Sequence, residues 1–406
     1  MPAVTSVSRE RPAARLLTLA ADPRVALAWW GLVAAIITVS VLWNPGFRSI
    51  YYLHPEAARN WWAGRPLYSD GIDFFQYLPQ SAILHTPFAL LGSPIGDVMW
   101  RWLGMGLMLL GLRRMAPLVA PERSSAAFAV MALLTLIPSL SSIQNGQPNL
   151  QVAGVMLHAA LDLATGRVGR GAMLLVLALV VKPVALVLVL LCGALFTPLR
   201  WRLALWIAIV ALVPFFTQAP GYVVDQYAGA LAKMLRAAQP DRNTFTDLNG
   251  IWWTLTGDSL DRGVLLLVQV AAALGTLLLG WIAVARRSAA EAPLAVWLLA
   301  CLYLMLFNPR NESNAFVIVA PALAAFAAQR LVGSAPDRRA GGAAALAAVL
   351  LGATGLTGPL NSLTTPWLKP AIVAVFALVA VRALLRDRPL MLDRPPAPQA
   401  QQPSPA

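Results

Sequence analysis

Apolar segments follow one another along most of this chain, with only short polar stretches between them. The runs are roughly 15 to 25 residues long, and a helix needs about 20 apolar residues to cross a lipid bilayer. The pattern therefore predicts an all-α polytopic membrane protein with about twelve transmembrane helices. We expect these helices at residues 25–43, 98–112, 126–143, 148–164, 171–181, 184–196, 203–217, 264–284, 292–307, 315–328, 343–356 and 367–385.

The segment 77–91 is also apolar, but it is short and contains Pro79, His85 and Pro87. Two interpretations remain open: a complete span, or a helix that lies in the membrane interface. A complete span would turn the loop at Arg113 and Arg114 outward, or would require another segment not to cross. We therefore expect an interfacial or partly inserted segment here.

The composition agrees with a membrane architecture. Of the 406 residues, 58% are hydrophobic and 12% are charged, whereas soluble domains carry about 25% charged residues. The formal net charge of +13 would fit a nucleic-acid partner, but the arginines lie in small groups at predicted helix ends. These groups include Arg113 and Arg114, Arg167 and Arg170, Arg200 and Arg202, Arg286 and Arg287, and Arg338 and Arg339. Such groups mark cytoplasmic loops, so we expect no nucleic-acid partner.

This charge asymmetry predicts a topology for the whole chain. Residues 1–24 and 389–406 are expected in the cytoplasm, residues 25–388 form one transmembrane domain, and loops 44–76 and 218–262 face outward. The tail 389–406 is rich in Pro and Gln, so we expect it to be disordered. The run 25–43 is too long for the core of a typical signal peptide and is interpreted as a retained first helix. The expected location is the inner (plasma) membrane.

The first predicted outer loop, 44–76, combines many aromatic residues with three carboxylates, Glu56, Asp70 and Asp73. One interpretation is an interfacial aromatic belt around an ordinary loop. The other is a surface for sugar binding, since aromatic faces stack on pyranose rings and carboxylates bind or deprotonate hydroxyls. Composition alone supports both.

The segment Ser141–Gln151 places five amide side chains between two apolar segments, among them Gln147 and Asn149. A turn accounts for Asn145-Gly146 and Pro148. It does not account for so many amides at membrane depth, where unpaired polar groups are costly. We expect these side chains to line a wet cavity.

Two basic residues lie in unusual places. Lys182, followed by Pro183, interrupts an apolar stretch, and Arg310 shares a very short loop with Glu312. Lys182 could extend to the outer interface, and Arg310 could form an ordinary surface ion pair. An intramembrane ionisable residue is more often functional, so we interpret Lys182 and Arg310 as ligands of a lipid phosphate.

The second predicted outer loop, 218–262, again mixes carboxylates, tryptophans and amides, including Asn249. The chain contains no P-loop, no dinucleotide-binding fingerprint and no HExxH or CxxC spacing. Its three histidines, His54, His85 and His158, are scattered. We therefore expect neither a cofactor nor a metal site.

Several of these segments, in this order, resemble glycosyltransferase family 87. They are AARNWWAGRPLY (57–68), FQYLPQSAILHTPFALLG (75–92), NGQPNLQ (145–151), VVKP (180–183), NGIW (249–252) and NPRNESN (308–314). The resemblance implies a GT-C fold with an extracytoplasmic active site. It also implies an inverting, metal-independent hexosyltransferase, most often a mannosyltransferase. Such an enzyme moves a sugar from a polyprenyl phosphate donor to a lipid or glycan acceptor.

The resemblance also implies roles for individual residues. The family places an aspartate, expected to act as base, where this chain has Ile50. We therefore expect the base among Asp73, Asp70 and Glu56, with Asp73 first because it adjoins the aromatic FFQY run. Lys182 and Arg310 are expected to hold the donor phosphate, and the expected sugar or acceptor contacts are Gln147, Asn149, Tyr68, Tyr77 and Asn249. The alternative function is a lipid or glycan transporter or flippase, which would also use broken helices.

Overall fold

The computed structural model describes residues 19–45, 49–69, 74–238, 245–353 and 363–393. All regular secondary structure within these residues is helical. In lipid every backbone N–H and C=O group needs a partner within the protein, and helices satisfy these groups locally.

Within the described residues, each of the twelve predicted segments lies on a helical part of the chain, and residues 354–356 of the segment 343–356 fall outside the described part. Six described helices are long and apolar enough to cross a membrane. They centre on α2 (Pro23–Trp43), α6 (Ile95–Val119), α7 (Ser124–Asn145), α11 (Arg200–Leu212), α14 (Arg262–Arg286) and α19 (Leu368–Leu385). The others are shorter: α8 (Asn149–Ala164), α9 (Val168–Val181), α10 (Leu186–Leu195), α15 (Glu291–Phe307), α16 (Ala320–Val332) and α17 (Arg338–Ala353). The all-α polytopic architecture is confirmed, and the number of twelve spans stays a prediction.

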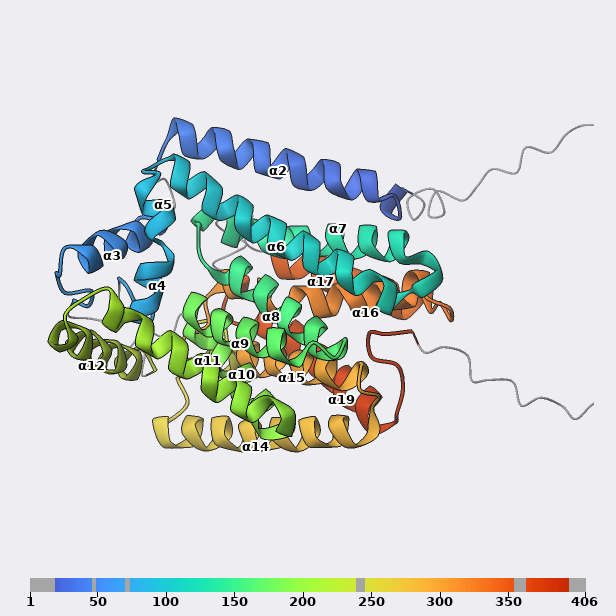
Figure 1. Cartoon of the computed structure of the whole chain (residues 1–406). Helices are drawn as coiled ribbons and strands as arrows, with labels where there is room; N and C mark the ends of the chain where they lie inside the picture. Colours follow the sequence, from blue (N-terminus) through green and yellow to red (C-terminus); the bar gives the residue numbers. More distant parts are fainter. Residues whose placement is uncertain (1–18, 46–48, 70–73, 239–244, 354–362, 394–406) are drawn as a thin grey trace, which may run out of the picture.

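The segment 77–91 contains two short helices, α4 (Pro79–Leu84) and α5 (Thr86–Leu90). With six and five residues, neither approaches the roughly 20 residues that a span requires. They gather with α3 (Leu53–Trp62) and α12 (Pro220–Ala237) at one end of the bundle, on the left in Figure 1. The two predicted outer loops therefore contribute helices to the same end of the molecule.

The core of the bundle is built around α8, which is buried along nearly its whole length. It packs against α6, α9 and α15. Gly154 of α8 makes the approach to α6 possible, because a Cβ atom there would lie 2.9 Å from the Cβ of Leu107. Small residues serve this purpose between membrane helices, where close van der Waals packing drives association.

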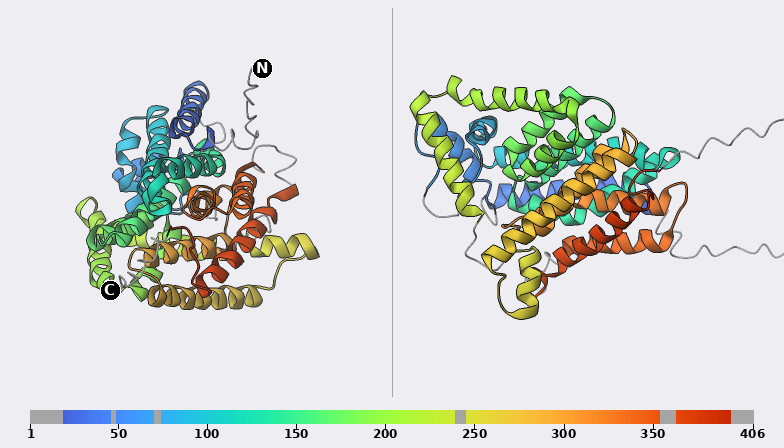
Figure 2. Two further views of the ribbon diagram at one scale, coloured as in Figure 1. Left: turned by 90° about the vertical axis from the view of Figure 1, so that its right-hand side faces the viewer. Right: turned by 90° about the horizontal axis from the view of Figure 1, so that it is seen from below.

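The periphery is apolar and exposed, as expected where helices face lipid. α14 runs along the edge of the bundle (Figure 2), and only 6% of its most apolar 18-residue stretch is buried against the rest of the protein. At the arginine-rich end, by contrast, the fully buried Asp162 of α8 forms ion pairs with Arg114 and Arg170. Charge at that end is therefore used to join helices.

Candidate functional site

The amide-rich turn between α7 and α8 has a defined backbone. Gly146 ends α7 in the left-handed region at φ 65°, where residues with a Cβ atom are strained. Its surroundings are tight, since a Cβ atom would lie 3.0 Å from both Tyr51 Cβ and Arg101 Nη2. The turn therefore requires glycine, and Gln147 and Asn149 follow directly from it.

Buried groups of α6 hold this turn from one side. Arg101 pairs with Asp97 at 2.7 Å and donates hydrogen bonds to the carbonyl oxygens of Ile143 and Gln144. The backbone N–H of Ile50 donates to Asn145 O at 2.9 Å. The first predicted outer loop is thus attached to the turn, and Ile50, where the resemblance implies an aspartate, lies beside it.

A break between α9 and α10 brings a cation to the same place. Lys182 has extended backbone angles, and Pro183 begins a short 3₁₀ helix that leads into α10. The Lys182 Nζ atom donates to Asn149 Oδ1 at 2.5 Å. The broken helix therefore puts an ammonium group against the first residue of α8.

The loop after α15 completes a polar cluster. Asn149 Nδ2 donates to Gln147 Oε1 at 2.8 Å and to Asn314 Oδ1 at 2.7 Å. Gln147 Nε2 donates to Glu312 Oε2 at 2.7 Å, and Asn314 Nδ2 donates to the same oxygen at 3.4 Å. We call Gln147, Asn149, Lys182, Glu312 and Asn314 the amide cluster.

Tyr77 and Arg310 lie beside the amide cluster. The charges of Glu312 and Arg310 act on both Tyr77 and Lys182. Burial raises the pKa of Tyr77, so its phenol remains protonated. The Tyr68 hydroxyl donates to Tyr77 O at 2.7 Å and so supports this residue from behind.

In the described part of the chain, Asn249 and Glu56, two other predicted site residues, form no hydrogen bond with the amide cluster. Asn249 belongs to α13 (Leu248–Thr256), where its Oδ1 atom accepts a hydrogen bond from Leu260 N at 2.8 Å. The side chain of Glu56 is exposed on α3. Asp70 and Asp73 lie outside the described residues. The prediction that one of these three carboxylates is the base therefore stays a prediction.

Two histidines that the sequence did not single out lie next to the site. The rings of His54 and His85 stack at 4.3 Å, and His54 lies 4.9 Å from the Tyr77 ring. Burial and the nearby His85 and Lys182 lower the pKa of His54 well below its usual value, so its ring is neutral. No short-range spacing reveals this pair, because His54 belongs to α3 and His85 lies at the junction of α4 and α5.

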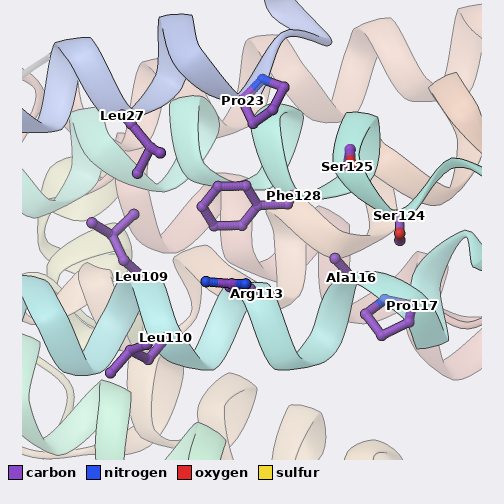
Figure 3. A pocket seen from close by; sticks show the side chains of 10 residues that line it. All are labelled: Pro23, Leu27, Leu109, Leu110, Arg113, Ala116, Pro117, Ser124, Ser125 and Phe128. Carbon is purple, nitrogen blue, oxygen red and sulfur yellow. The ribbon is translucent and has the colours of Figure 1, made fainter.

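A cavity of about 520 Å³ lies at the opposite end of α7 from the amide cluster. Its walls come from α2, α6 and α7, as Figure 3 shows, and they include Leu27, Arg113, Ser124 and Phe128. The 22 residues of α7 place this cavity about 30 Å from the cluster, at 1.5 Å per residue. It contains none of the predicted site residues.

Among the described residues, no group of three His, Cys, Asp or Glu side chains is arranged to hold a metal ion. A model of glycosyltransferase family 87 matches residues 75–309, which is more than half of the chain. The chain belongs to glycosyltransferase family 87. No curated protein matches it.

Membership of glycosyltransferase family 87 makes this chain a membrane glycosyltransferase, which needs a sugar donor and an acceptor. It favours the transferase over the transporter that the sequence had left open. The match includes Tyr77, Gln147, Asn149 and Lys182, and it ends one residue before Arg310. Glu312 and Asn314, the other two members of the amide cluster, lie beyond it.

Proposed function

We propose that this family 87 protein transfers one sugar from a polyprenyl phosphate to a hydroxyl of a lipid or glycan acceptor, and that the sugar is mannose. The transfer inverts the configuration at the sugar carbon, uses no metal ion, and takes place at the extracytoplasmic face of the inner membrane. The amide cluster carries this proposal, because it combines a cation for a phosphate with amides for sugar hydroxyls.

Lys182 and Arg310 are the proposed ligands of the donor phosphate. A polyprenyl-phosphate sugar is a phosphodiester with one negative charge and a long apolar chain. Lys182 lies at the break between the apolar helices α9 and α10. At this place the polyprenyl chain can remain in lipid while its phosphate reaches the ammonium group. Charge-assisted hydrogen bonds to phosphate are stronger than neutral ones.

Gln147 and Asn149 are the proposed ligands of the sugar, with Tyr77 beside them. Each amide offers both donors and acceptors. This suits a sugar, because each of its hydroxyl groups both donates and accepts hydrogen bonds. These amides are already oriented by one another and by Lys182. An oriented site loses less conformational freedom when the sugar binds.

The test is a transfer assay with purified protein in lipid nanodiscs. Radiolabelled polyprenyl-phosphate mannose and total membrane lipids are supplied, and a labelled acceptor lipid or glycan is expected. A parallel reaction with a nucleotide mannose as the only donor should give no product. Movement of label across sealed vesicles without a new labelled product would instead support a transporter.

A further inference from the structure

The amide cluster contains one carboxylate, Glu312, whose two oxygens differ. Oε2 accepts hydrogen bonds from Gln147 Nε2 and Asn314 Nδ2. Oε1 accepts none from the described residues, and the side chain is only half-buried. One oxygen is therefore fixed in place, while the other can accept a proton from an incoming group.

Lys182 and Glu312 stand at the two ends of a chain of hydrogen bonds. Lys182 bonds to Asn149, and Asn149 reaches Glu312 through either Gln147 or Asn314. Two amides in series thus stand between the cation and the carboxylate. An inverting displacement needs a base and a phosphate ligand that are different groups, because the leaving phosphate and the attacking hydroxyl occupy opposite faces of the sugar.

We propose that Glu312 is the general base of the transfer; this inference rests on the proposed function. The acceptor oxygen attacks the anomeric carbon and its proton passes to Glu312 Oε1. The bond between the anomeric carbon and the phosphate oxygen breaks, and its electron pair leaves with the polyprenyl phosphate at the Lys182 end. The proton on Glu312 then returns to water.

The formal charges favour this direction of proton transfer. Before the reaction, the carboxylate of Glu312 and the phosphodiester of the donor each carry one negative charge. Afterwards Glu312 is a neutral carboxylic acid and the polyprenyl phosphate is a monoester dianion. The total charge is unchanged, but one negative charge has moved from Glu312 to the phosphate that Lys182 and Arg310 hold. Coulomb attraction in a partly buried site stabilises that product.

Glu312→Gln tests the assignment, since glutamine keeps the shape and can accept the same hydrogen bonds without acting as a base. We expect a fall in kcat of roughly 10²- to 10⁴-fold, the usual size of general-base catalysis. Binding of polyprenyl-phosphate mannose, measured separately, should be retained. Glu312→Asp should keep part of the activity. Glu122→Gln, which changes an exposed carboxylate between α6 and α7, should keep all of it.

Azide separates a base from a structural residue, because azide attacks carbon without losing a proton. Glu312→Gln should therefore form mannosyl azide at a rate near the rate at which the wild type forms it. A second test places a new carboxylate beside the amide-rich turn by adding Ile50→Asp to Glu312→Gln. This double variant should recover part of the transfer to the natural acceptor.

The outcomes distinguish this inference from the proposed function. If the wild-type protein gives no product with any polyprenyl-phosphate sugar, the proposed function is wrong. If the wild type is active and Glu312→Gln is equally active, only the assignment of Glu312 is wrong. Loss of transfer in Asp73→Asn, with full activity in Glu312→Gln, would assign the base to the first outer loop instead.

Discussion

Lys182 is the residue for which sequence and structure agree most directly. A lysine within an apolar stretch is conspicuous in the sequence, and the structure places its Nζ atom on the amide cluster. Its partner residues were conspicuous for the same reason, since amides at membrane depth need polar neighbours. Polar residues in apolar surroundings are thus the ones that a sequence reveals.

Lys182→Ala should raise the apparent donor KM at least tenfold and change kcat less. A hydrogen bond to a charged group contributes about 1.5–3 kcal/mol, and about 1.4 kcal/mol corresponds to a factor of ten. Arg310→Ala should act in the same direction. Initial rates at varied polyprenyl-phosphate mannose measure both, with Arg59→Ala, an exposed arginine of α3, as the control. A wild-type donor KM in both variants would place the phosphate elsewhere.

Asp247 predicts a dependence of stability on pH. Burial raises its pKa from 3.8 to about 6, even though its side chain caps α13 by accepting a hydrogen bond from Gly250 N at 2.9 Å. Because its pKa is higher in the folded state, protonated Asp247 stabilises the fold. This contribution to the free energy of unfolding is complete below about pH 4 and is lost as the pH rises through 6. The shift corresponds to roughly 3 kcal/mol.

Asp247→Asn should remove this dependence and make the protein more stable than the wild type at pH 7.5. Asparagine is also a good helix cap, so the hydrogen bond to Gly250 is kept. Unfolding temperatures in nanodiscs between pH 4.5 and 7.5 provide the measurement. Asp258→Asn, an exposed residue of the same loop, should leave the wild-type profile unchanged. Parallel profiles for wild type and Asp247→Asn would contradict the prediction.

At the scale of elements, helix ends and breaks were predicted better than their contacts. The sequence identified the turn at Gly146 and the break at Lys182 through Gly and Pro. It could not show that the loop 308–314 meets this turn, because Gln147 and Glu312 are 165 residues apart. The stacked pair His54 and His85 was missed for a related reason, since nothing in local periodicity reports contacts between separate helices.

Gly146→Ala tests whether the turn between α7 and α8 orients the amide cluster. Alanine would be strained by about 1–2 kcal/mol in the left-handed region, and its Cβ would press on Arg101 and Tyr51. Activity per folded molecule should therefore fall. Gly166→Ala is the matched control, since Gly166 also has a positive φ, of 75°, but open space around it. Equal activity in the two variants would mean that the turn geometry is not needed.

At the scale of the whole molecule, the two ends of the bundle differ in chemistry. One end carries α3, α4, α5 and α12 together with the amide-rich turn (Figure 1). The other carries the arginine groups and the buried ion pairs of Asp162. The positive-inside rule orients such a molecule with its arginines in the cytoplasm. A donor with an extracytoplasmic sugar would then meet the amide cluster directly.

Cysteine labelling in intact cells tests this orientation. Asp258→Cys, in the second predicted outer loop, should react with a membrane-impermeant maleimide. Arg338→Cys, at the start of α17, should react only after the cells are opened. Both positions are exposed, while the native Cys192 and Cys301 are buried, so the wild type should give little background. Labelling of Arg338→Cys but not of Asp258→Cys in intact cells would show that the orientation is the opposite of the predicted one. The active site would then face the cytoplasm, and the donor would have to present its sugar there. Family membership would be unaffected, because it rests on residues 75–309 and not on orientation.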